Sequence, residues 1–313
     1  MQTNVVQISA PDVLEYKSVE LPALGPQDVL ILQHAIGVNY LDVFFRNGTF
    51  PVNAYPAPVG VEAAGIIEQV GAEVKHFKAG DRVAYYGPFG AYAEKRILHE
   101  KELFSLPDDI TFDQAAAVMV KGLTAHMLLK SSHPVKAGEL VLIHAMTGGV
   151  GSILSAWARS LGATVIGTVG SAAKKTLALQ RGYERVIDLQ TEEMTDKVDV
   201  VYDGTGRDTF YKSLELLKPG GSAVLYGWPS GMPELDHHWM EERHIHFVTA
   251  VLNNYPAYQD KSGTALNEVF DLIRKGVIDL HPLVYDLADA ARAHKDLESR
   301  KTTGSIILKR LHA

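Results

Sequence analysis

The chain of 313 residues is long enough for one large domain or two ordinary ones, and its 46% hydrophobic and 21% charged residues are typical of a globular protein with a sizeable core. A net charge of −7 argues against a nucleic-acid partner, and no apolar run reaches the roughly 18 residues of a membrane span. The N-terminal residues lack the pattern of a signal peptide, so a cytoplasmic location is expected. The absence of cysteine excludes disulfides, cysteine-ligated zinc, iron–sulfur clusters and thiol nucleophiles.

The N-terminal part, up to about residue 120, is rich in glycine, proline and short β-type runs. Examples are DVLILQHAIGVN (28–39), VGVEAAGIIEQVG (59–71) and DRVAYYGPFGAYAEKRIL (81–98). Turn signals such as AGDRV and LPDDI separate these runs. The pattern predicts an irregular, β-barrel-like domain.

From residue 122 to about residue 250, strand-like runs alternate with helix-like runs. This alternation predicts a doubly wound parallel sheet of the Rossmann type, with right-handed crossovers. Helices are expected over Val150–Leu161, over KKTLALQRG (174–182) and over TFYKSLELLKPGG (209–221), the last of them ending at its glycine pair. The expected strands are residues 139–145, 164–169, 184–189, 199–204, 222–227 and 244–250.

The C-terminal part returns to helical patterns, in ALNEVFDLIRKG (265–276) and ADAARAHKDLES (288–299). It finishes on a strand-like run, SIILKR (305–310). A terminal strand after a Rossmann unit is expected to rejoin the N-terminal domain.

The first strand and first helix of the Rossmann pattern are joined by HAMTGGVG (144–151). A dinucleotide-binding turn needs a tight turn, a backbone that pyrophosphate can approach, and a small residue where helix meets strand. In G-x-G-x-x-G register, Met146 replaces the glycine that eases the turn, while Gly148 and Gly151 are kept. Gly149 adds a bare position, and helix amides from Val150 onward can hold the pyrophosphate. The flanking strand and helix favour a dinucleotide site over an ordinary loop.

The end of the second strand indicates which dinucleotide is bound. NAD-binding folds place an acidic residue there for the ribose hydroxyl, whereas this chain reads GTVGSAAKK (167–175). Gly170, Ser171, Lys174 and Lys175 offer an amide, a hydroxyl and two cations, which suit the 2′-phosphate of NADP(H). The alternative is that both lysines belong to a solvated helix face.

With the fold placed, a family resemblance can be stated. AIGVNYLDVFFRNG, PVGVEAAGIIEQVG, VKHFKAGDRV, KGLTAHMLL, HAMTGGVG, GTVGSAAKK, VVYDGTGRDT and TGSIIL follow one another as in the quinone oxidoreductases, the zeta-crystallin-like proteins of the medium-chain dehydrogenase/reductase superfamily. The chain resembles this family from about residue 5 to residue 308.

The resemblance implies a split catalytic domain, which is a partly open, GroES-like barrel of residues 1–121 and 251–313. It implies an NADP-binding Rossmann domain of residues 122–250, with the active site in the cleft between the domains. A homodimer through the last strand of the cofactor sheet, near His244–Ala250, is implied as well.

The zinc enzymes of this superfamily bind their metal through a cysteine and through the histidine of a G-H-E motif. In the corresponding places this chain has Asn39 and Val61. Neither a metal nor alcohol oxidation through a zinc-bound alkoxide is therefore expected. What remains is hydride transfer from a held nicotinamide to an acceptor that needs little activation, such as a quinone.

Catalytic roles follow from the resemblance. Asn39 would lie near the nicotinamide and the acceptor, where its amide would bond a quinone oxygen or the ribose, or it would only shape a turn. Thr124 would touch the nicotinamide, or satisfy the backbone as a hydroxyl at a helix N-terminus. Lys121 would contact the cofactor or cap the domain crossover.

Four further positions would border the cofactor by the same resemblance. Gly204 and Gly227 would end two strands that face it, where a small residue admits it. Leu252 and Asn253 would follow the last strand and border the nicotinamide.

Three charged residues are expected to be structural. Asp42 and Arg46 lie four residues apart, which predicts an ion pair within one helix. Glu62 is expected to be a buried acid that bonds to backbone or to an arginine rather than acting as a base.

Three departures from the family pattern matter. Relatives often carry tyrosines where this chain has Phe44 and Phe50, so the acceptor pocket is predicted to be more apolar than usual. Relatives often place a tyrosine against the adenosine phosphate where this chain has Leu189, so NADP(H) would depend more on Ser171, Lys174 and Lys175. The segment LQTEEMTDKVDVV (189–201) lacks the usual longer helix before its strand.

These observations predict an NADPH-dependent quinone reductase without a metal. One alternative is an NADPH-dependent reductase of activated alkenes such as enals or enones, which must also protonate a carbon atom; Phe44 and Phe50 favour quinones over these. A second alternative is a protein that binds NADPH without useful turnover. The lack of a basic stretch argues against nucleic acid as a partner.

Overall fold

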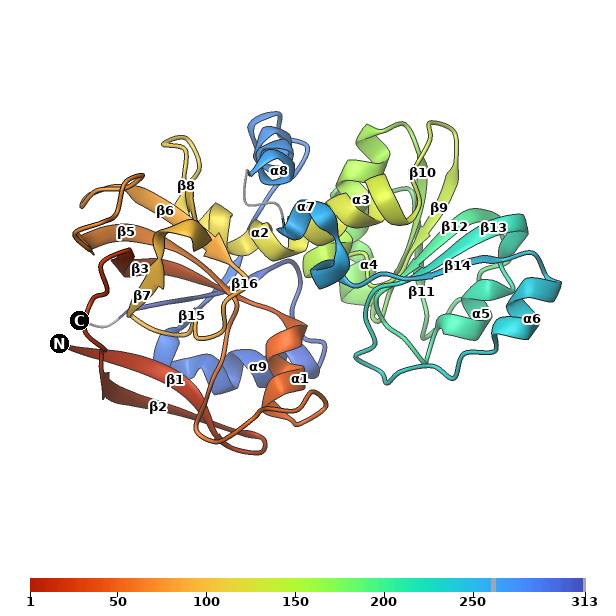
Figure 1. The fold of residues 1–313 in the computed structure, drawn as a ribbon. Coiled ribbons are helices and arrows are strands. Elements are labelled where there is room, and N and C mark those ends of the chain that lie inside the picture. The colour runs from red at the N-terminus through yellow and green to blue at the C-terminus, as the bar shows by residue number, and fades with distance from the viewer. Residues whose placement is uncertain (260–262, 312–313) are drawn as a thin grey trace. The chain divides into compact units, whose positions relative to one another are not determined.

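The computed structural model describes residues 1–259 and 263–311 (Figure 1). These residues form two compact units. The first unit comprises Met1–Val120, Gly263 and the segment from Leu280 onward, and the second comprises the chain from Lys121 to residue 259 together with Thr264–Asp279. Residues 251–279 were expected in the catalytic domain. Residues 251–259 and 264–279 cluster instead with the second unit, where Glu268 pairs with His126 (3.4 Å between Oε2 and Nε2), whereas Gly263 clusters with the first.

The first unit is built on two sheets. The smaller sheet has the strand order β2-β1-β4, and the larger has the order β15-β16-β3-β5-β6-β8, with β7 paired to β3. The strands are β1 (Gln2–Ala10), β2 (Val13–Glu20), β3 (Asp28–Val38), β4 (Ala57–Pro58), β5 (Glu62–Val70), β6 (Arg82–Tyr86), β7 (Lys95–His99), β8 (Leu103–Ser105), β15 (Leu283–Asp286) and β16 (Ile306–Lys309). Strand β16 pairs antiparallel with β3, so the terminal strand rejoins the N-terminal domain as predicted.

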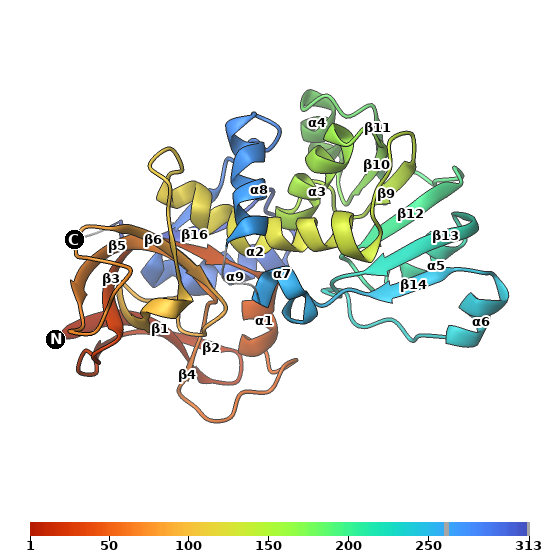
Figure 2. The ribbon, with the colours of Figure 1, turned by 45° about the horizontal axis from the view of Figure 1, so that its top comes forward.

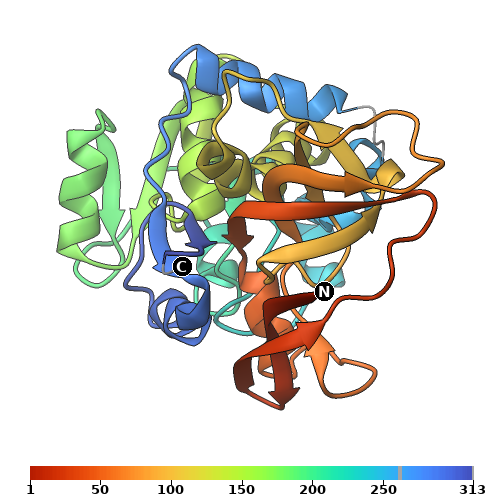
Figure 3. The same cartoon turned by 90° about the vertical axis from the view of Figure 1, so that its left-hand side faces the viewer.

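Two helices flank the sheets of the first unit, α1 (Tyr40–Arg46) and α9 (Ala290–Glu298). Helix α9 contacts both α1 and strand β2, which lies in an antiparallel hairpin with β1 (Figure 3). The short 3₁₀ turns η1 (Glu100–Glu102) and η4 (Leu287–Asp289) complete the unit. Its core is apolar and continuous, and Ile8, Ile31 and Leu308 are almost fully buried in it.

The second unit contains a parallel sheet with the strand order β11-β10-β9-β12-β13-β14. Its strands are β9 (Leu140–Ile143), β10 (Thr164–Val169), β11 (Arg185–Asp188), β12 (Val198–Asp203), β13 (Leu217–Leu225) and β14 (His246–Thr249). The chain starts at the centre, runs to one edge and then returns to the other side. This is the Rossmann order, and it confirms the predicted fold.

The helices of the second unit cover both faces of the sheet. Helices α3 (Gly149–Ser160) and α4 (Ala172–Gln180) lie on one face, and α5 (Phe210–Leu214) and α6 (His237–Glu242) lie on the other (Figure 2). The C-terminal part adds η3 (Leu252–Asn254), α7 (Pro256–Gln259) and α8 (Thr264–Arg274). Because the strand order reverses at β9, right-handed crossovers put the helices of the first half of the sheet on one face and those of the second half on the other.

The helix predicted over residues 209–221 is wrong beyond its first turn. Helix α5 ends at Leu214, and strand β13 begins at Leu217. The backbone N–H of Val198 donates a hydrogen bond to the carbonyl of Leu216 (2.8 Å), and Val198 is paired with Leu217. Pairing with β12 therefore takes the backbone that the helix would need. The segment at residues 189–197 has no helix, as its short length predicted.

Helix α2 (Phe112–Met127) continues at its C-terminal end into a π-helical turn, η2 (Leu128–Ser132). Thr124 thus lies near the end of a long helix, and its predicted alternative role as a helix N-terminal hydroxyl is wrong. The real start has a sequence signal. The Thr111 hydroxyl accepts from the N–H of Gln114 (3.1 Å), and the Gln114 side chain accepts from the N–H of Thr111 (2.9 Å), which is a capping box.

Within the described residues, no helix combines the length and the apolar character that crossing a membrane requires.

Candidate cofactor and acceptor site

The predicted cofactor residues of the second unit follow the carboxyl ends of its parallel strands. Gly148, Gly149 and Val150 come after β9; Gly170, Ser171 and Lys174 after β10; Gly204 after β12; Gly227 after β13; Leu252 and Asn253 after β14. Carboxyl ends of parallel strands meet at one edge of a sheet, and this edge is where such folds bind their ligands. The topology therefore brings all of these residues to the same edge.

The turn from β9 to α3 carries no side chains at Gly148 and Gly149, where a phosphate would approach its backbone. Gly148 is the N-cap residue of α3, and the helix begins at Gly149. A Cβ atom built on Gly151 would overlap with the carbonyl oxygen of Ala145 and stand 3.0 Å from Cα of Met146. Gly151 is therefore required for the contact between the helix and the turn, as its place in the motif predicted.

Met146 does not occupy the strained position of the turn. The left-handed residue is Ala145, with φ of 51°. The Met146 side chain is buried, at 2% exposure, and lies against Gly167 of β10. Sequence reasoning missed Ala145, because a left-handed backbone is expected at glycine and an alanine gives no such signal.

We expect Met146 and Gly167 to be energetically coupled. Gly167→Ala would make the new Cβ overlap with Sδ of Met146, which costs about 1–3 kcal/mol of unfolding free energy. Met146→Ala alone leaves a cavity and costs about 2–5 kcal/mol. In the double variant the new methyl group occupies part of that cavity, so the combined loss should be smaller than the sum. Urea unfolding of the four proteins measures the coupling, and strictly additive losses would contradict it.

The candidate 2′-phosphate site lies at the start of α4. Ser171 is the N-cap residue, and its hydroxyl accepts a hydrogen bond from the N–H of Lys174 (3.4 Å). The ammonium of Lys175 instead binds the carboxylate of Glu192 (2.6 Å to Oε2). The Lys175 ammonium thus has a carboxylate partner within the second unit. Leu189 is 48% exposed and has no polar group to offer.

Gly204 and Gly227 are close to each other and to a phenol that sequence reasoning missed. A Cβ atom on Gly204 would lie 2.5 Å from the hydroxyl of Tyr226, and one on Gly227 would lie 3.2 Å from the carbonyl oxygen of Gly204. Burial, with the charge of Asp203 in addition, raises the pKa of Tyr226 above its ordinary value. The phenol therefore stays neutral at this edge of the sheet.

His144, also missed, is buried within the motif itself. Its Nδ1 pairs with the Thr168 hydroxyl (2.8 Å) and its Nε2 with the Ser213 hydroxyl (2.6 Å). Burial lowers the pKa of His144, so the ring stays neutral. It joins β9 to β10 and to α5, which is a structural role.

In the first unit, Asn39 is the N-cap residue of α1 and is 7% exposed. Its backbone N–H donates to Oδ2 of Asp42 (2.8 Å), and its side-chain Nδ2 donates to Oε1 of Glu62 (2.8 Å). Oε2 of Glu62 accepts from the backbone N–H of Val120 (2.8 Å). Glu62 is fully buried and bonds to backbone, as predicted.

Aromatic side chains follow α1 and the loop after it. The Phe44 ring lies 5.0 Å from the Tyr40 ring and 5.2 Å from the Phe50 ring, measured between centroids. Phe50 also packs edge-on against Phe45. These rings form an aromatic cluster, to which Tyr40 adds a hydroxyl group. Burial is the main cause that raises the pKa of Tyr40, so it too stays neutral.

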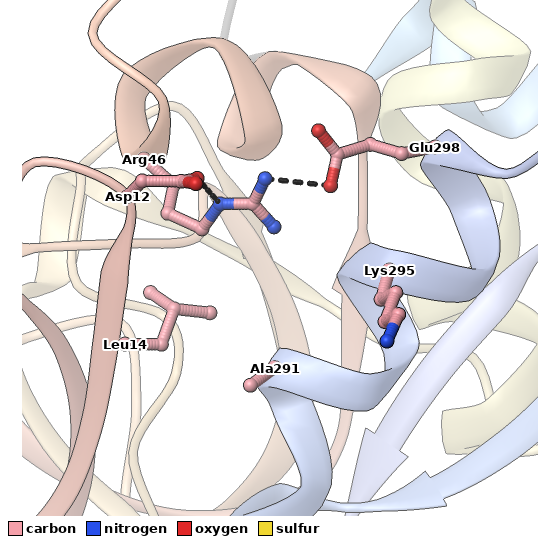
Figure 4. A pocket seen from close by; sticks show the side chains of 6 residues that line it. All are labelled: Asp12, Leu14, Arg46, Ala291, Lys295 and Glu298. Atoms are coloured by element: carbon pink, nitrogen blue, oxygen red, sulfur yellow. Dashed lines mark hydrogen bonds and ion pairs between the residues drawn. The ribbon is translucent and has the colours of Figure 1, made fainter.

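An ion pair of Arg46 with Asp42 was predicted, and the pairs that the structure shows for Arg46 reach outside its own helix. Its guanidinium binds Asp12 (2.9 Å) and Glu298 (2.6 Å). Figure 4 shows these pairs at the wall of a pocket of about 210 Å³ between the β1–β2 turn, α1 and α9. Because the arginine is already paired with both acids, the arrangement joins three elements, and we assign no ligand to it.

Lys121 and Thr124 both lie in α2 and are buried, at 5% and 9% exposure. They are three residues apart, so they share one face of the helix.

Comparison with known proteins decides the family. Residues 25–108 match the alcohol dehydrogenase GroES-like domain, and residues 181–308 match a family described as zinc-binding dehydrogenase. A quinone oxidoreductase of Pseudomonas aeruginosa is 42% identical over 311 residues, which cover 95% of this chain and 96% of that protein. The chain belongs to the quinone oxidoreductase family.

Other members of the superfamily are also similar to this chain in sequence or structure. The crystal structure of Escherichia coli quinone oxidoreductase complexed with NADPH has a TM-score of 0.92 and 36% identity, covering 98% of this chain and 99% of that one. A 2-haloacrylate reductase of a Burkholderia species is 38% identical over 320 residues, covering 95% of each chain. The family is the zinc-free branch of the medium-chain dehydrogenases/reductases, as its motifs predicted.

One matched family is named for zinc binding, but this chain lacks the zinc ligands of that superfamily. Asn39 and Val61 stand where zinc-binding members carry their cysteine and histidine. In the part of the chain that the structure describes, His, Asp and Glu side chains form no group of three that could hold a metal ion.

Proposed function

We propose that this protein is an NADPH-dependent quinone reductase that works without a metal. The observation that carries the proposal is the bare turn at Gly148–Gly151, in a chain whose relatives include a quinone oxidoreductase solved with NADPH. When bound, NADPH supplies the hydride. The protein holds and orients it, excludes water and stabilises the acceptor.

The turn fits a pyrophosphate. Gly148 and Gly149 have no side chain, and the N-terminus of the 12-residue helix α3 offers the amides of Gly149 and Val150 to an anion. We assign the 2′-phosphate to Gly170, Ser171 and Lys174.

On the acceptor side, we assign catalysis to Asn39, Phe44, Phe50 and Thr124. The Asn39 amide donates a hydrogen bond to the acceptor oxygen, on which negative charge develops. The two phenylalanine rings pack against the flat quinone ring. Lys121 and Thr124 contact the nicotinamide end, and Gly204, Gly227, Leu252 and Asn253 border it.

The alternative substrate class is activated alkenes, and the 2-haloacrylate reductase among the relatives favours it. Reduction of such an alkene needs a proton on carbon as well as a hydride. Phe44 and Phe50 have no proton to give, so quinones are the better fit.

The test is NADPH oxidation by purified protein, followed through the loss of nicotinamide absorbance. Para-benzoquinone, a naphthoquinone and a simple enone are compared as acceptors, and NADH is the control donor. We expect fast turnover of quinones with NADPH and slow turnover of the enone. Preference for the enone would assign the protein to alkene reduction. Tight NADPH binding without turnover of any acceptor would make it a binding protein.

We further propose that the protein is a cytoplasmic homodimer joined through β14. In the described residues β14 pairs only with β13, so its other edge has backbone groups available to a second copy. Sedimentation measures the mass, and cell fractionation tests the location; a monomer at micromolar concentration would contradict the dimer.

A further inference from the structure

Glu62 is a charged side chain with no exposed surface, at the first position of β5. Burying a carboxylate is costly unless its oxygens accept good hydrogen bonds. Here each oxygen accepts one at 2.8 Å: Oε1 from Nδ2 of Asn39, and Oε2 from the backbone N–H of Val120. The backbone N–H of Val120 can only donate, so Oε2 is an acceptor. An ionised carboxylate has no hydrogen to give, so Oε1 is an acceptor too. The carboxylate then leaves Asn39 only one way to turn its amide, with the nitrogen toward Glu62.

Asn39 is held at its backbone as well. Its N–H donates to Oδ2 of Asp42 (2.8 Å), and this oxygen also accepts from the Tyr92 hydroxyl (3.1 Å), which in turn meets Nε2 of His294 (2.9 Å). All of these side chains are buried. Asn39 is therefore fixed by a connected set of hydrogen bonds rather than by a single contact.

The oxygen of the Asn39 amide faces the first turn of α1. Asn39 and Asp42 form a capping box, in which the Asn39 side chain faces the backbone N–H of Asp42. The hydrogen bond that this N–H makes, at 3.0 Å, is to the backbone carbonyl of Asn39, so the cap only orients the oxygen. An amide group is planar. Once one hydrogen of Nδ2 points at Glu62 and the oxygen faces the helix, the direction of the second hydrogen is determined.

We propose that Glu62 is a positioning residue, which aims the second amide hydrogen of Asn39 at the carbonyl oxygen of the acceptor. The inference rests on the proposed function and deepens it, because it names the atom that the acceptor must offer: an oxygen that becomes negatively charged as hydride arrives. A donor fixed in advance needs no reorganisation at that moment, which is where such donors are most effective. Quinones and enones both carry this oxygen.

The test is a double-mutant cycle of Asn39→Ala and Glu62→Gln in the full-length protein with NADPH and para-benzoquinone. We expect Asn39→Ala to lower kcat and kcat/KM about 100-fold, as for the loss of one donor to a developing negative charge. In Glu62→Gln the new amide nitrogen must face Val120 or Asn39, which are both hydrogen-bond donors, so one of the two bonds is lost. We therefore expect kcat to fall about tenfold. The Kd of NADPH should change less than about twofold. In the Asn39→Ala background Glu62→Gln should lower kcat no further, because the group it positions is gone.

The stability of the same four proteins separates positioning from simple support of the fold. The bond to Val120 does not depend on Asn39, so any loss of melting temperature from Glu62→Gln should persist in the Asn39→Ala background. Losses of kcat that multiply in the double variant, or an unchanged kcat in Glu62→Gln, would overturn the proposal.

A reciprocal exchange covers the case in which Glu62→Gln does not fold. In the double variant N39D/E62Q, the glutamine oxygen accepts from Val120 and its nitrogen donates to the aspartate. The buried bonds and the net charge are thus rebuilt, and only the donor at position 39 is lost. We expect a melting temperature close to that of the wild type with kcat at least about 100-fold lower. Turnover at the wild-type rate would refute the role of the amide hydrogen.

A spectroscopic readout keeps this test separate from that of the proposed function. Wild-type protein that reduces no acceptor would contradict the proposed function alone. The side-chain NH₂ signal of Asn39, identified by its loss in Asn39→Ala, still reports the positioning: one proton should be shifted downfield by the carboxylate and lose that shift in Glu62→Gln. An unchanged signal would show that Glu62 does not orient the amide.

Discussion

The Gly151→Ala variant is expected to lose both stability and affinity for NADPH. The added Cβ would overlap with the carbonyl oxygen of Ala145 and approach its carbonyl carbon to 2.9 Å and Cα of Met146 to 3.0 Å. All three are backbone atoms, so no side chain can rotate to make room. Relief requires α3 to move away from the turn, at a cost of about 1–3 kcal/mol or more in unfolding free energy. The same movement displaces the amides that would hold the pyrophosphate, so the Kd should rise at least about 100-fold.

Gly148 and Gly170 provide matched controls. On Gly148 the only close atom would be the carbonyl oxygen of Ala145 at 3.2 Å, and its φ of −79° suits alanine. Gly148→Ala should therefore keep its stability within about 1 kcal/mol and weaken only NADPH binding. Gly170→Ala meets nothing within 4 Å and should leave the fold unchanged. Urea unfolding and nicotinamide fluorescence measure the two effects. Wild-type stability of Gly151→Ala would show that the helix and the turn are not in close contact.

The second large effect is expected on the choice of cofactor. Lys174→Ala should lower the ratio of kcat/KM for NADPH to that for NADH by about 10- to 100-fold, because a charge-assisted hydrogen bond to the 2′-phosphate is lost. Lys174 is in the first turn of α4, where Ser171 caps the helix. Activity with NADH should stay near its wild-type value, since NADH has no phosphate at this place.

Lys175→Ala is the matched control, because Lys175 is adjacent to Lys174 in sequence and its ammonium already has a carboxylate partner. The Lys175 ammonium is bound to Glu192, whose carboxylate also accepts from the N–H of Asp188 (2.8 Å). Its removal should change the cofactor ratio less than about threefold, as expected for an exposed ion pair. Equal effects of the two substitutions would mean that both lysines share the phosphate or that neither contacts it.

Much of the fold could be predicted from local patterns. The strands at 139–145 and 164–169 and the helix between them were placed to within two residues, because their apolar residues repeat with the period of each structure and short turns join them. The start of α2 at Phe112 was missed, although the capping box at Thr111 and Gln114 marks it in the sequence. The helix beyond Leu214 was predicted from its pattern, but pairing with β12 overrode it.

The sequence predicted which residue types form the candidate site, but it did not predict which residues contact one another. Gly151 is recognisable because any side chain there would collide with the turn, which makes glycine a visible requirement. The partners of Lys175 and Arg46 were not recognisable, because Glu192 and Glu298 lie 17 and 252 residues further along the chain. Charged side chains select partners by distance in space, and sequence spacing reports this distance only within one helix or hairpin.

The sequence by itself therefore determined the alternation of strands and helices in the second unit, the glycine-rich turn and the family, since each of these can be read from local patterns and motifs along the chain. Only the tertiary structure decided that Ala145 is left-handed, that Met146 covers Gly167, and that Glu62 holds Asn39. The carboxylate of Glu62 stands between a side chain 23 residues before it and a backbone N–H 58 residues after it. Such a junction forms only when distant segments pack, and its hydrogen bonds are strong because packing has removed the water around them.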